Sequence, residues 1–244
     1  MYEFEKSKAK IEEILKSPTK IIEKTKIPSS DTEFTYENGI NAWVGALFVD
    51  IVDSSEMFKS ANEDTARIMR SFCSEIISIL KDDKNYQEIG IRGDCVYCIY
   101  SAAYQDDLLE IFRHAYRINS FMSMFNKLLK SNGYPMIRAG IGLGCGLDLI
   151  IKAGQSGSGI NDKIWIGKAL VDAACLSGVA NRNGIFPIAM SPLFYDNISE
   201  KLYNEDSNYK EWIKSHQMSF NGEVDYYHCN IIETGFDEWI EENV

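Results

Sequence analysis

The order of the apolar segments along the chain constrains its fold more strongly than any other feature of the sequence. Residues 42–50 are apolar almost throughout, which is typical of a buried strand. Apolar residues then recur at helical spacing over 68–80, two short strands flank a glycine–aspartate turn within 89–100, and a second helical pattern covers 105–131. Residues 136–151 are again strand-like. This order predicts an α+β fold, a split βαβ sandwich with helices on one face of a mainly antiparallel sheet.

The same pattern divides the chain into three parts. Residues 1–40 are expected to form an N-terminal helix, over 1–24, and a loop. Residues 41–192 hold the regular succession of strands and helices and form the main domain. Residues 193–244 are expected to form a C-terminal extension that packs on this domain and contains a strand near 223–232.

The last part of the main domain is less regular. A polar, glycine-rich loop is expected over 154–162, a helix over 167–180 and a strand over 184–189. The glycines of the loop do not match the spacing of a phosphate-binding loop, so we interpret the segment as a surface loop.

Composition excludes several classes of protein. The chain carries 36 acidic and 25 basic residues, a net charge of −11, which argues against coating a nucleic acid or docking to an anionic membrane. No apolar run approaches the ~20 residues that a membrane-spanning helix requires, and the first residues lack a signal-peptide pattern. We therefore expect a cytoplasmic protein without nucleic-acid or membrane partners. Most of its cysteines lie inside apolar patterns, and without a secretion signal they are expected to be reduced core thiols. Cys95 and Cys98 would face opposite sides of a strand, so this pair is not expected to hold one ion.

Two aspartates lie where strands of this fold end. Asp50 closes the first apolar strand, and Asp94 occupies the hairpin turn. In a split βαβ order the first strand lies beside that hairpin, so both carboxylates can reach one point, and a divalent cation would relieve their repulsion. The main-chain carbonyl of Ile51 offers a further oxygen ligand. The residues alone leave a second interpretation open, in which Asp50 caps a helix and Asp94 simply occupies a turn.

Four segments, in this order, resemble the motifs of class III nucleotide cyclases. Phe48–Ser55 resembles their first metal motif, and Arg92–Tyr97 resembles the second. Arg138–Gly144 is similar to their R-x-G-I-x-x-G strand, and Gly167–Leu176 is similar to the helix written G-x-x-V-N-x-A-x-R-L. The resemblance spans about residues 42–190 and implies a ferredoxin-like nucleotide cyclase domain.

The resemblance also implies a two-metal reaction. Asp50, Asp94 and the carbonyl of Ile51 would hold two Mn²⁺ or Mg²⁺ ions, which bind the triphosphate and lower the pKa of the ribose 3′-hydroxyl. The 3′-oxygen would then attack the α-phosphate in line, and diphosphate would leave. Ser54 and Ser55 open a helix whose amides favour phosphate, or are an ordinary helix cap. Cyclases of this class act as head-to-tail dimers, so we expect a homodimer whose sites are completed across the interface.

The chain departs from the class at the positions that read purines and stabilise the transition state. The adenine-reading lysine of the family falls on Gly90, where guanylate cyclases have a glutamate, and its partner aspartate falls on Ile164. The transition-state asparagine and arginine fall on Val171 and Cys175. The substitute for this arginine stays open, the candidates being Arg92, Lys152, Lys168 and Arg182.

These departures, together with Lys152–Gly154 and Ser158–Asp162, resemble the pyrimidine cyclases of the bacterial Pycsar anti-phage system. The resemblance implies UTP as substrate and cyclic UMP as product, which would activate a separate effector protein. The alternatives are conversion of CTP to cyclic CMP, a purine cyclase that recognises its base through backbone groups or unusual side chains, and a degenerate cyclase domain that senses nucleotides. Phe48 is a candidate to line the pocket for the base or ribose, and is equally well explained as a core residue. Contacts to the substrate are expected from Phe48, Ser54, Ser55, Arg92 and Lys152.

Overall fold

Regular secondary structure covers most of the chain. The computed structural model describes residues 2–57, 59, 62–155, 159–217 and 225–244. The helices described are α1 (Phe4–Lys16), α2 (Ser54–Met57), α3 (Glu63–Leu80), α4 (Gln105–Ser131), α5 (Lys168–Val179), α6 (Pro192–Glu205), α7 (Tyr209–Trp212) and α8 (Thr234–Asn243). The strands described are β1 (Lys20–Glu23), β2 (Asn38–Ile51), β3 (Tyr86–Arg92), β4 (Cys95–Ser101), β5 (Ala139–Gln155), β6 (Ile160–Ile166), β7 (Ile188–Met190), β8 (Ile213–His216) and β9 (Tyr226–Cys229).

The strands form one sheet around β2 and β5. Its order is β3-β4-β2-β5-β7-β9-β8, with β1 paired to β2 and β6 paired to β5. The β1–β2 and β5–β7 pairs are parallel, and the other pairs are antiparallel. The predicted α+β class with a mainly antiparallel sheet is therefore confirmed. The β3–β4 hairpin lies beside β2, as the split βαβ order requires.

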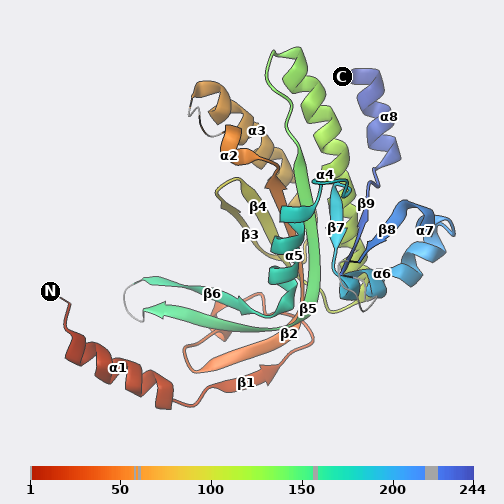
Figure 1. Cartoon of the computed structure of the whole chain (residues 1–244). Helices are drawn as coiled ribbons and strands as arrows, with labels where there is room; N and C mark the ends of the chain where they lie inside the picture. The colour runs from red at the N-terminus through yellow and green to blue at the C-terminus, as the bar shows by residue number, and fades with distance from the viewer. Residues whose placement is uncertain (1, 58, 60–61, 156–158, 218–224) are drawn as a thin grey trace.

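One face of the sheet carries the main hydrophobic core. Side chains alternate along a strand, so Leu47 and Val49 of β2 point to the same face as Leu143 of β5, and all three are fully buried there. α3 and α4 cover this face with the apolar stripes that their helical spacing predicts, including Phe72 and Phe112 (Figure 1). Each large side chain buried in this way stabilises the fold by roughly 1.5–3 kcal/mol. The core thereby fixes the end of β2 and the β3–β4 hairpin relative to each other.

α5 packs on the opposite face, so the prediction that the helices share one face is wrong for this element. Gly140, Gly142 and Gly144 of β5 face α5. A Cβ atom on Gly142 would lie 2.0 Å from the carbonyl oxygen of Ala173, so the two backbones can approach this closely only where glycine stands. The helix was expected from its sequence, but its side of the sheet depends on these close contacts.

The β5–β6 hairpin replaces the loop that was expected over 154–162. β5 continues to Gln155 and β6 begins at Ile160, and Figure 1 shows the pair extending well beyond the central strands. Gly154 has a φ of +128°, a backbone conformation that residues other than glycine rarely adopt, and it pairs with Asn161. The glycines that suggested a loop therefore allow a twisted hairpin. Part of the expected loop, residues 156–158, lies outside the described residues.

The two ends of the chain also add strands to the sheet. The helix expected over 1–24 ends at Lys16, and β1 follows it and pairs with β2. The strand expected near 223–232 is the shorter β9, which pairs with β7 and β8, while residues 218–224 lie outside the described residues. In the described part of the chain, no helix is both long and apolar enough to cross a membrane.

Candidate active site

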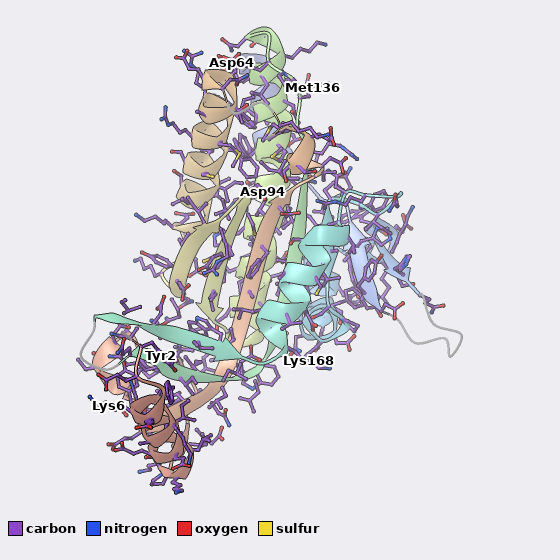
Figure 2. All side chains as sticks on the ribbon, turned by 60° about the vertical axis from the view of Figure 1, so that its left-hand side comes forward. Tyr2, Lys6, Asp64, Asp94, Met136 and Lys168 are labelled. Carbon is purple, nitrogen blue, oxygen red and sulfur yellow. The ribbon has the colours of Figure 1, made fainter. Side chains whose placement is uncertain are left out.

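The two aspartates lie at neighbouring strand ends. Asp50 is the penultimate residue of β2, and Val49 before it pairs with Val96 of β4. Asp94 occupies the β3–β4 turn beside Gly93, whose φ of +65° favours glycine. Figure 2 shows Asp94 at this turn, close to the end of β2. Both positions agree with the sequence analysis, which expects Asp50 at the end of the first apolar strand and Asp94 in the hairpin turn.

The electrostatics of Asp50 show that the two carboxylates interact. Burial raises the pKa of Asp50 above its ordinary value of 3.8, and the negative charge of Asp94 raises it further. A hydrogen bond from Arg182 and the positive charge of that guanidinium act in the opposite direction without cancelling the rise. A half-buried carboxylate beside a like charge is destabilised in its ionised form, which is the condition that a bound cation relieves.

A cavity of about 530 Å³ opens between α5 and the sheet. Phe48 and Asp50 of β2 line it from one strand, and Arg92 lines it from the hairpin. β6 contributes Trp165, and the end of α5 contributes Ser177. The volume is in the range of small-molecule sites, and the wall combines aromatic rings with a few charged groups.

A hydrogen-bonded aromatic cluster forms one wall of this cavity. The Tyr97 hydroxyl donates to Glu88 Oε1 at 2.7 Å, and Trp165 Nε1 donates to Glu88 Oε2 at 3.0 Å. The Tyr97 ring stacks on Phe48 with centroids 5.2 Å apart. A Cβ atom on Gly90 would lie 2.4 Å from the Tyr97 ring, so the absence of a side chain at Gly90 makes room for this ring. The Tyr97 ring therefore occupies space beside the position where the family's purine-reading side chain would stand.

Several other sequence-predicted residues lie elsewhere. Lys152 lines a separate small cavity of about 140 Å³ beside Phe34 and Lys163 rather than the main one. Lys168 begins α5, and Figure 2 shows it at the end of this helix away from Asp94. Ser54 and Ser55 open a helix as expected, but this helix, α2, spans only four residues, and the helical spacing over 68–80 belongs to a second helix, α3, which begins at Glu63.

Arg182, in the turn after α5, is the one of the four arginine-substitute candidates that contacts Asp50 in the described part of the chain. Its Nη2 donates to Asp50 Oδ2 at 2.9 Å and to the carbonyl oxygen of Ile51 at 3.3 Å. Among the other candidates, Arg92 lines the main cavity. The structure thus brings Asp50, Ile51, Arg92 and Arg182 to one region and leaves Lys152 and Lys168 outside it.

The oxygen groups at this point fit a divalent cation that is shared with a substrate. Asp50, Asp94 and the Ile51 carbonyl are hard oxygen donors, which Mg²⁺ and Mn²⁺ prefer. Within the described residues, no group of three or more His, Cys, Asp or Glu side chains is placed to hold a metal. Two carboxylates with one carbonyl suit a cation that takes its remaining ligands from water and substrate phosphates.

The cysteines are free thiols. Cys95 lines the cavity, where burial raises its pKa to about 12, and Cys98 lies in the core on the other face of β4. The two side chains point to opposite faces as predicted, and a thiol with a raised pKa is a poor nucleophile at neutral pH.

Comparison with known proteins identifies the family. No protein-family model matches the chain. It is 38% identical over 245 residues to a uridylate cyclase of Treponema porcinum, a match that covers 100% of this chain and 82% of the relative. The chain belongs to the uridylate cyclase family. A uridylate cyclase of Gulbenkiania mobilis is 28% identical, and the match covers 99% of this chain and 97% of that protein.

Solved structures show the same fold. The adenylyl cyclase CyaB from P. aeruginosa matches with a TM-score of 0.61 at 17% identity, covering 78% of this chain and 95% of that one. The guanylyl cyclase Cya2 matches with a TM-score of 0.62 at 13% identity, covering 80% and 95%. The resemblance to class III cyclases that the motifs indicate is confirmed, and this member of the uridylate cyclase family is a nucleotide cyclase.

Sequence reasoning missed three residues of the cavity wall in this family member. Glu88 belongs to none of the family motifs, since it stands two residues before Gly90, the position that corresponds to the family's base-reading side chain. In the sequence, Tyr97 belongs only to the second metal motif, and Trp165 belongs to none of the four motifs. The alternation of β3 could have pointed to Glu88, because residues two apart on a strand face the same side.

Proposed function

We propose that the chain converts UTP to cyclic UMP and diphosphate. The observation that carries this proposal is the cavity that holds Asp50, the aromatic pair Phe48–Tyr97 and the carboxylate of Glu88 on one face of the sheet. Membership of the uridylate cyclase family supports the choice of UTP. The alternatives are CTP as substrate, and a domain that binds nucleotides without turning them over.

The reaction uses few protein groups. Asp50, Asp94 and the Ile51 carbonyl would hold Mn²⁺ or Mg²⁺, which when bound neutralises the triphosphate and makes the 3′-hydroxyl more acidic. The 3′-hydroxyl gives its proton to solvent water, its oxygen forms a bond to the α-phosphorus, and the bond between the α-phosphorus and the oxygen that bridges to the β-phosphate breaks as diphosphate leaves. Arg92, in the cavity wall, can stabilise the growing negative charge on the phosphates. Catalysis consists chiefly of positioning and charge stabilisation.

The aromatic wall suits a one-ring base. Because the Tyr97 ring fills the space beside Gly90, no side chain can stand at that position to read a purine. Phe48 and Tyr97 offer ring faces on which a base can stack. Glu88 accepts two hydrogen bonds, which fix its orientation, and its remaining lone pairs can accept from the N3–H of uracil.

The proposal includes a homodimer and a role in defence. Exposed apolar side chains on β6 and α5, among them Ile160, Ile164 and Val171, offer a surface that a second copy would cover. As in the Pycsar resemblance, cyclic UMP would activate a separate effector protein during phage infection. The cytoplasmic location stays a prediction.

The experiment compares UTP turnover in the wild type with Asp50→Asn and Asp94→Asn at equal Mn²⁺ concentration. Both substitutions keep side-chain size and remove one carboxylate charge, so the variants should fold, by circular dichroism, and produce no detectable cyclic UMP. A chelator should abolish wild-type turnover and added Mn²⁺ should restore it. Full activity in either variant would contradict the assignment of the metal ligands.

A further inference from the structure

The turn after α5 holds an arginine between the helix and the predicted metal ligands. Asn181 and Asn183 flank Arg182 with positive φ angles of 58° and 51°. Arg182 Nη1 donates to the carbonyl oxygens of Ser177 at 2.9 Å and Ala180 at 3.1 Å, near the C-terminal end of α5. These bonds place the guanidinium at the negative end of the helix dipole, where a cation is favoured.

The other side of the same guanidinium contacts two groups that also serve as predicted metal ligands. Arg182 Nη2 donates to Asp50 Oδ2 and to the Ile51 carbonyl oxygen. The Arg182 and Asp50 side chains are 21% and 26% exposed, so solvent screens this ion pair only in part. Arg182 therefore neutralises the Asp50 carboxylate and occupies the Ile51 carbonyl oxygen. A bound cation would need both groups as ligands.

We propose that Arg182 competes with the divalent cation for Asp50 and Ile51, so that the cation binds weakly until a triphosphate is present. This inference rests on the proposed function. A cation and a guanidinium repel each other and need the same oxygens, so cation binding requires Arg182 to leave. The phosphates of a bound nucleotide offer the guanidinium another anionic partner, since arginine binds phosphate oxygens well. Nucleotide and cation would thus enter the site together.

The test is a titration with Mn²⁺ of the nucleotide-free protein, in which electron paramagnetic resonance measures free Mn²⁺. Arg182→Met keeps much of the aliphatic volume and removes the charge-assisted hydrogen bonds, so its Mn²⁺ affinity should rise roughly tenfold. Arg182→Lys keeps the charge but cannot span both sets of acceptors, so its affinity should lie between those of the wild type and the methionine variant. In the presence of a non-cyclisable UTP analogue, the Mn²⁺ affinities of Arg182→Met and the wild type should differ less than they do without it.

The matched control is Arg138→Met. Arg138 lies close to the same turn, where it donates to the carbonyl oxygen of Asn181 at 2.9 Å and pairs with Asp53 at 3.4 Å. In the described part of the chain it forms no hydrogen bond or ion pair with Asp50. Arg138→Met removes the same positive charge as Arg182→Met and so corrects for a general effect of charge on cation binding. We expect the Mn²⁺ affinity of Arg138→Met to stay close to that of the wild type. Urea unfolding shows whether each variant folds. If Arg182→Met does not fold, the comparison of Arg182→Lys with the wild type tests the proposal.

Asp50→Asn separates the failure of this inference from the failure of the proposed function. If Asp50→Asn abolishes Mn²⁺ binding but Arg182→Met binds no more tightly than the wild type, or no more tightly than Arg138→Met, the competition is refuted while the metal site stands. If Asp50→Asn binds Mn²⁺ as well as the wild type, the metal assignment and the competition both fail. A structural role for Arg182 alone would lower stability without raising the affinity for Mn²⁺.

Discussion

Replacing Gly140 by alanine should damage the fold and the candidate site together. Gly140 pairs with Asp50 across β2 and β5 and faces the end of α5. A Cβ atom there would lie 2.3 Å from the carbonyl oxygen of Ser177, 2.6 Å from that of Ala180 and 3.1 Å from Arg182 Nη1. The added methyl group would therefore meet the two carbonyls that hold the arginine and the arginine itself.

The cost of this substitution follows from the atoms that it meets. Ordinary contacts between carbon and its neighbours are 3.5–4.0 Å, so the closest contact is too short by about 1 Å. Both nearest atoms belong to the backbone of α5 and the turn after it, which cannot turn aside as a side chain can. Overpacking of a core costs about 1–3 kcal/mol, and this case should lie at the upper end, about 3 kcal/mol.

Urea unfolding of Gly140→Ala beside Gly178→Ala measures this cost. Gly178 also belongs to the end of α5, but a Cβ atom there meets nothing within 4 Å, so alanine should leave the free energy of unfolding unchanged or raise it by about 0.5 kcal/mol. A loss below about 1 kcal/mol for Gly140→Ala would refute the reasoning, since ordinary surface changes stay within about 0.5 kcal/mol. An equal loss in both variants would refute it as well.

Three further predictions concern the site. Asp94→Asn should lower the pKa of Asp50, measured by carbon NMR on the metal-free protein, because the like charge is removed; an unchanged pKa would show that the carboxylates do not interact. Because folding raises the pKa of Asp50, its ionisation opposes folding, so stability should fall as the pH rises from 3.8 through the folded-state pKa, and Asp50→Asn should remove this part of the pH–stability curve. Glu88→Gln keeps the side-chain size, its amide oxygen can still accept from Trp165 Nε1, and its amide nitrogen can donate to a Tyr97 hydroxyl that turns to accept, yet kcat/KM for UTP should fall roughly tenfold. Glu88→Ala should also lose stability, and full activity of Glu88→Gln would show that the base does not use the charge.

The regular elements were predictable because their side chains follow simple periods. The helix expected over 105–131 is α4, and the strand expected over 42–50 lies within β2, because long apolar patterns reflect which face is buried. The face that α5 covers was not predictable from the sequence. It depends on how closely the backbone of α5 approaches the glycines of β5, and the apolar pattern of the helix does not show this. The β5–β6 hairpin could not be predicted, because a glycine such as Gly154 is as typical of a turn as of a twisted strand.

The candidate site was predictable to the extent that its residues stand at strand ends. Asp50 and Asp94 follow from the order of the elements, whereas the contact of Arg182 with Asp50 joins positions 132 residues apart and depends on how α5 ends. The alternation of β3 places Glu88 on the same face as Gly90, but the orientation of its carboxylate depends on the Tyr97 and Trp165 side chains, which the strand pattern does not give.

The most direct test of the central claim is to incubate the purified protein with Mn²⁺ and an equimolar mixture of ATP, GTP, CTP and UTP, and to identify the products by mass. The account predicts cyclic UMP as the main product, formed with an equal amount of diphosphate and absent from Asp50→Asn. Cyclic AMP or cyclic GMP as the main product would contradict the interpretation of the aromatic wall as a one-ring base site. Cyclic CMP as the main product would contradict the choice of uracil, and the absence of any product would contradict the proposed activity itself.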